Sequence, residues 1–163
     1  MGKQQTYRAI LSTAVVACLA WSGGVLAAEP VGPKLTEKLR GLLVKEMIEI
    51  EAAMKETYGA IIQGKHEEVA QKGQAIHDSF ILEQSLTEQD RQDLKAAVPK
   101  EFLQMDQRFH QLSASLVEAG KQKNTEEQLE TFNRMTESCV ACHSRYVTDR
   151  FEGLGDQSIP MNW

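Results

Sequence analysis

Aromatic residues are scarce in this sequence, at 6% of 163 residues, and proline occurs only 4 times. A composition of this kind suits helices better than a sandwich of strands. The chain has 18 basic against 23 acidic residues, so it lacks the positive excess that nucleic-acid binding requires. Three cysteines are too few for a disulfide scaffold. With 42% hydrophobic and 25% charged residues, the chain is typical of one compact globular domain.

Residues 1–28 have the pattern of a secretory signal peptide. Lys3 and Arg8 form the basic start, an apolar run follows over residues 9–20, and the alanine pair that ends the segment resembles a signal peptidase site. The apolar run is too short to span a bilayer comfortably, so we expect export to the periplasm without stable membrane insertion. A lipoprotein signal ending at Cys18, or a retained anchor, is the alternative.

The rest of the chain has the apolar spacing of amphipathic helices. The pattern predicts long helices over residues 35–62, 66–84, 100–119 and 125–150. Thr87 can cap a short additional helix, which Pro99 interrupts. We expect Gly120 to end the third long helix, and Thr125 with Gln128 to form a capping box that opens the fourth.

No segment alternates with period two over a useful length, so no sheet is expected. We therefore predict an all-α fold, an antiparallel four-helix bundle over residues 29–152. The tail, residues 153–163, should be irregular. His66 should be exposed, and His77 and His110 should lie at the boundary of their apolar faces.

The motif that carries chemistry is Cys139-Val140-Ala141-Cys142-His143. It has the C-x-x-C-H pattern of c-type haem attachment, in which two thiols bond to the haem vinyl groups and the histidine ligates the iron. On a helix, positions i, i+3 and i+4 share one face, so the three side chains can act together. We therefore predict one covalent haem c, which would also complete a core that is poor in aromatic residues. A redox dithiol, half of a zinc site and a simple disulfide are the alternatives.

A signal peptide, four helices and a single C-x-x-C-H in the last helix resemble the class II cytochromes c, the cytochrome c prime type. Arg40, Met47 and Met54 in the first helix, and Tyr146 after the motif, also fit this family. The resemblance implies that Arg40 pairs with a haem propionate and that Val44 lies over the distal face of the iron. A five-coordinate iron that admits NO or CO would follow. Met47, three residues further on, is the alternative distal ligand.

These expectations define the functional hypotheses. The first is a mono-haem cytochrome that carries electrons between redox partner proteins, binds a diatomic gas, or does both. The alternatives are a six-coordinate, low-spin electron carrier with Met47 as ligand, and a haem-free bundle with a redox-active or metal-binding cysteine pair. No catalytic constellation is visible, so no enzyme is predicted. The family resemblance further implies a homodimer.

Overall fold

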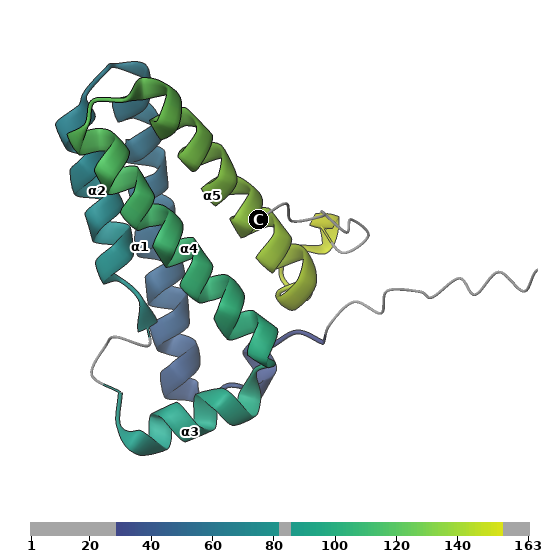
Figure 1. Ribbon diagram of the computed structural model, residues 1–163. Helices are drawn as coiled ribbons and strands as arrows, with labels where there is room; N and C mark the ends of the chain where they lie inside the picture. The colour runs from purple at the N-terminus through teal and green to yellow at the C-terminus, as the bar shows by residue number, and fades with distance from the viewer. Residues whose placement is uncertain (1–28, 82–85, 155–163) are drawn as a thin grey trace, which may run out of the picture.

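The computed structural model describes residues 29–81 and 86–154 (Figure 1). This part of the chain contains α-helices and short 3-10 turns, but no strand. The helices are α1 Glu37–Ile62, α2 His66–Asp78, α3 Glu88–Ala97, α4 Lys100–Lys121 and α5 Thr125–Tyr146. The predicted all-α helical bundle is confirmed. The predicted signal peptide and most of the predicted tail lie outside the described residues.

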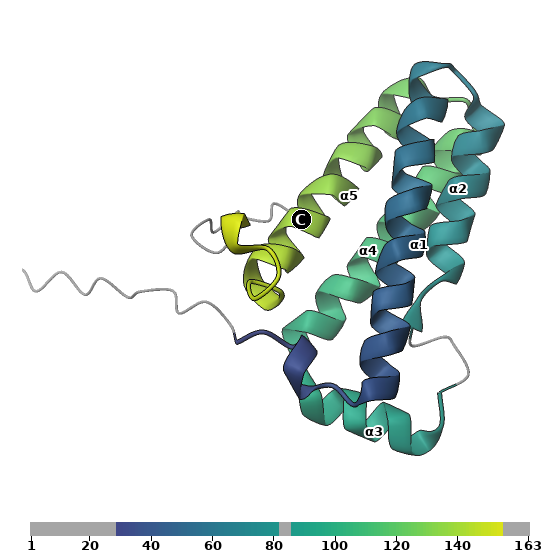
Figure 2. The ribbon, with the colours of Figure 1, turned by 180° about the vertical axis from the view of Figure 1, so that it is seen from behind.

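The four longer helices run side by side, and α3 crosses one end of them (Figure 1). Helix α2 packs against both α1 and α4, and α5 packs along α4. Helix α5 approaches α1 closely only near the end opposite α3, and the two helices diverge towards the α3 end (Figure 2). The C-x-x-C-H motif lies in this diverging half of α5.

Side-chain caps fix several helix starts. Thr36 accepts a hydrogen bond from the Leu39 amide at the start of α1. Thr87 forms the predicted cap of α3. It belongs to a full capping box, in which the Thr87 side chain accepts a hydrogen bond from the Asp90 amide and the Asp90 carboxylate accepts one from the Thr87 amide. Such caps satisfy amides that have no partner within the helix. Pro99 precedes α4, as its missing amide and fixed φ favour.

Other predicted boundaries are wrong. Helix α2 ends at Asp78 rather than at residue 84, and α5 ends at Tyr146 rather than at residue 150. Gly120 does not end α4 but lies inside it, at a close approach to α2. Helix α5 is capped by Asn124, whose side chain accepts the Glu127 amide, so the predicted capping box one residue later does not form.

The core has two apolar clusters along the bundle. Cluster A lies towards the α3 end and consists of Val31, Leu35, Leu39, Leu86, Leu94, Val98, Phe102, Met105, Ala141 and Tyr146. Cluster B lies towards the other end and consists of Ile50, Ala53, Ala60, Ile61, Val69, Ile76, Phe109, Leu112, Leu116 and Met135. The amide of Val31 donates to the Tyr146 carbonyl, which ties the start of the described chain to the end of α5. The diverging end of α5 is therefore held in place.

Candidate functional site

The C-x-x-C-H motif lies at the junction of the two apolar clusters. Cys139 packs against cluster B and Cys142 packs against cluster A. Both side chains are half-buried free thiols. His143 is also half-buried and follows in the last turn of α5, so the three residues occupy one face as their spacing predicts.

Burial suppresses ionisation of both thiols. It raises the pKa of Cys139 to about 11 and that of Cys142 to about 12. The negative charge of Asp106 contributes to the second shift, which places Asp106 within electrostatic reach of the motif. A thiol that stays protonated at neutral pH is a poor nucleophile. In the free protein this environment disfavours a reactive thiolate pair.

The His143 ring is held by a residue that the sequence alone did not indicate. After α5 the chain turns back, and Phe151 stacks on the His143 ring with centroids 4.5 Å apart and planes 14° from parallel. Burial lowers the pKa of His143, so its imidazole stays neutral over a wider pH range. The neutral imidazole is the form that binds a metal through a ring nitrogen.

On α1, the residues that the resemblance selected have different surroundings. Arg40 is exposed, and Val44 is 38% exposed. Met47 is half-buried and packs against cluster B, the cluster that Cys139 also contacts. Among the described residues, neither cluster includes Val44. The structure thus associates Met47 with the motif more directly than it does Val44.

The other histidines differ from their predicted environments in two cases. His66 is half-buried rather than exposed, and its Nδ1 lies 3.0 Å from the Nε2 of the buried Gln128. His110 is not a boundary residue, because it is only 3% exposed and lies within a group of buried acidic side chains. His77 stays at the boundary, next to the exposed Asp78.

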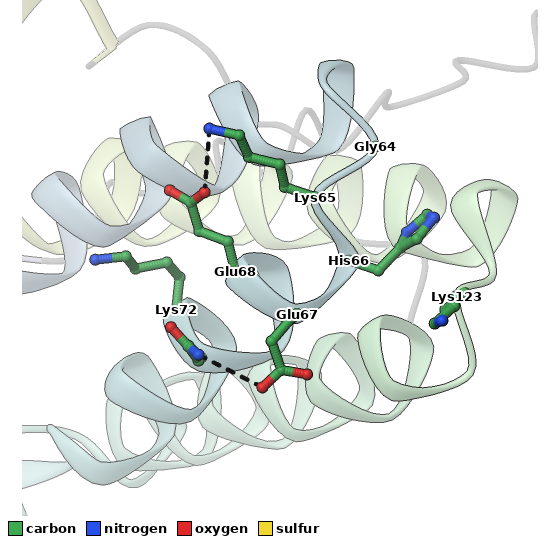
Figure 3. A pocket seen from close by; sticks show the side chains of 8 residues that line it. Gly64, Lys65, His66, Glu67, Glu68, Lys72 and Lys123 are labelled. Carbon is green, nitrogen blue, oxygen red and sulfur yellow. Dashed lines mark hydrogen bonds and ion pairs between the residues drawn. The ribbon is translucent and has the colours of Figure 1, made fainter.

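An open surface depression lies at the end of the bundle away from α3, around the start of α2 (Figure 3). Several of its side chains pair with one another, as in the ion pair of Lys65 with Glu68 and the hydrogen bond from Gln71 to Glu67. The depression is lined by none of the C-x-x-C-H residues.

Comparisons with family models, with curated proteins and with solved structures give no match to this chain. Within residues 29–81 and 86–154, no helix has the length and apolar character needed to cross a bilayer. Arguments about function therefore depend on the motif and its surroundings.

Proposed function

We propose that the chain is an exported mono-haem c-type cytochrome. Cys139 and Cys142 would hold the haem through thioether bonds, and His143 would ligate the iron. The observation that carries the proposal is the placement of this motif: its three side chains are half-buried on the part of α5 that diverges from α1.

The surroundings of the motif fit a large, flat, apolar group. Partly buried side chains from two helices face the same cluster: Met47 and Met54 from α1, with Phe132 and Cys139 from α5. The two helices pack together far less than α1 packs against α2 or α5 packs against α4. A porphyrin bound there would cover apolar surface that the protein leaves half-exposed, which is favourable by roughly 25 cal/mol per Å².

The chain's own residues have distinct roles in this proposal. Bound haem iron supplies one-electron chemistry between Fe(III) and Fe(II). The neutral imidazole of His143 offers a lone pair, and the stacked Phe151 limits rotation of that ring. Arg40 is exposed and would pair with a haem propionate, as the family resemblance implies. The negative charge of Asp106 acts on Cys142, whose pKa it raises.

Covalent attachment is tested directly by spectroscopy. We expect the full chain, expressed in a bacterium that matures c-type cytochromes, to show a Soret band that stays with the denatured polypeptide. Cys142→Ser should weaken this attachment, and the double variant with Cys139→Ser should abolish it. Cys18→Ser is the matched control and should leave it unchanged. A wild-type chain purified from such a host without haem would refute the proposal and favour the haem-free bundle.

The distal side decides between gas binding and electron transfer alone. With Val44 over the iron, the ferrous protein should be five-coordinate and should bind CO. Met47→Ala and Met54→Ala are a matched pair, because both methionines are partly buried against cluster B. A low-spin ferrous spectrum lost only in Met47→Ala would establish the six-coordinate alternative. That alternative is favoured by one observation, the shared packing of Met47 and Cys139 against cluster B.

A further inference from the structure

Three ionisable side chains meet inside the bundle, apart from the C-x-x-C-H residues. Glu46 comes from α1, and Asp106 and His110 come from α4. Their side chains are 0%, 10% and 4% exposed, respectively. The Nε2 atom of His110 lies 3.2 Å from Glu46 Oε1 and 3.8 Å from Asp106 Oδ1. One oxygen of each carboxylate and a nitrogen of the imidazole thus lie within 4.8 Å of one another.

Backbone groups hold His110 and Glu46 in position. His110 Nδ1 lies 2.9 Å from the Ile76 carbonyl oxygen, to which it must donate because a carbonyl only accepts. In the neutral ring, Nε2 then carries a lone pair that faces the two carboxylates. Glu46 Oε1 accepts the Ile81 amide at 3.0 Å. Backbone contacts of this kind orient the ligands of many metal sites.

Three atoms of the group make no hydrogen bond. They are His110 Nε2 and the second oxygen of each carboxylate, Glu46 Oε2 and Asp106 Oδ2, and all three are buried. Buried polar atoms are nearly always paired, and leaving one unpaired costs stability. A cation between the two carboxylates would supply these missing partners and would favour the ionised form of both.

We propose that Glu46, Asp106 and His110 bind a divalent transition-metal ion, with Zn²⁺ as the best-fitting case. A tetrahedral Zn²⁺ has ligand bonds of about 2.1 Å, which place its ligand atoms about 3.4 Å apart. The observed spacings of 3.2 and 3.8 Å lie on either side of that value. Two carboxylates neutralise the dication, and the ion links α1 to α4. The fourth position would be open to water, as in zinc sites with three protein ligands.

The first test uses the full-length wild-type protein, incubated with Zn²⁺ and then dialysed. We expect one retained zinc ion per chain, and X-ray absorption at the zinc edge should show only nitrogen and oxygen ligands at about 2.0–2.2 Å. Bound haem does not interfere, because iron absorbs at another edge. Sulfur at about 2.3 Å would place the ion on the cysteine pair, and no retained zinc would leave the cluster as a proton-sharing group. Either result overturns the proposal.

The second test compares His110→Gln with His77→Gln. His77 lies on α2 beside the exposed Asp78, so its variant controls for loss of a surface histidine. Loss of a residue that only orients a metal ligand weakens metal affinity roughly 10- to 100-fold. We expect His110→Gln, which removes a ligand, to weaken the zinc affinity measured by calorimetry by more than this. His77→Gln should bind as the wild type does. Equal affinity in both variants would show that the ion binds elsewhere. Because no haem ligand is involved, this outcome is independent of the haem proposal.

Discussion

Substitution of Gly120 by alanine tests how closely α2 and α4 pack. A Cβ atom at this position would lie 2.8 Å from the Ala70 amide nitrogen and 2.9 Å from both the Ala70 Cβ and the His66 carbonyl oxygen. Two of these neighbours are backbone atoms, so α2 itself would have to move. Overpacking of this kind costs roughly 1–3 kcal/mol, whereas replacing a glycine inside a helix by alanine gains up to about 1 kcal/mol. We expect Gly120→Ala to lower the free energy of unfolding by about 1–2 kcal/mol.

Gly41→Ala is the matched control. Gly41 also lies inside a helix, α1, but a Cβ atom there would meet nothing within 4 Å. The same change should therefore raise the free energy of unfolding by about 0.5–1 kcal/mol, from helix propensity alone. Urea unfolding followed by far-UV circular dichroism gives both values. If Gly120→Ala proved as stable as Gly41→Ala, the close contact between α2 and α4 would be refuted.

Three further predictions concern single side chains. In metal-free protein, burial raises the pKa of Asp106 from its ordinary value of 3.8 to about 7. This group's contribution to stability is therefore most favourable below pH 4 and is lost as pH rises through 7. The free energy of unfolding falls by at most roughly 4 kcal/mol over this range, at about 1.4 kcal/mol per pKa unit. Urea titrations in the presence of a chelator should show that the free energy of unfolding of Asp106→Asn depends less on pH than that of the wild type. Thr87→Ala removes the α3 cap, which should cost about 1 kcal/mol in urea unfolding at neutral pH. The same variant should raise the pKa of Asp90, which is about 2. The hydrogen bond from the Lys38 ammonium lowers this pKa most, and the hydrogen bonds from Thr87 lower it further. Phe151→Ala uncovers the ring of His143, so the pKa of that imidazole should rise towards its ordinary value in an NMR titration of haem-free protein; an unchanged pKa would show that the stacking does not bury the ring.

Local signals predicted the parts of the fold that local physics decides. The helical spacing of apolar residues located the long helices, and the capping preference of Thr87 located the start of α3. The shared face of Cys139, Cys142 and His143 follows from helix geometry once α5 is recognised. None of these features depends on which helix packs against which.

Features set by tertiary packing were missed. In sequence, Gly120 resembles a residue that ends a helix. In the structure, its lack of a side chain allows α2 and α4 to approach each other closely. Asn124 and Thr125 are neighbouring residues that both favour a cap, and sequence alone did not distinguish them. The contact of Phe151 with His143 depends on the chain turning back after α5, which no periodicity predicts.

One departure from the helical pattern was missed in the sequence, and the burial of Glu46 makes it visible. Glu46 lies seven residues after Leu39 and four before Ile50, so it occupies a core position of α1 where an apolar residue is expected, and it is fully buried there. A buried charge costs stability unless something compensates it, and such violations concentrate at functional sites. The opposite departure occurs at Met47 and Cys139, apolar side chains that stay half-exposed. A bundle built only for stability would exchange these environments. The two departures therefore coincide with the two proposed sites: the proposed cation beside Glu46, and the proposed haem over Met47 and Cys139.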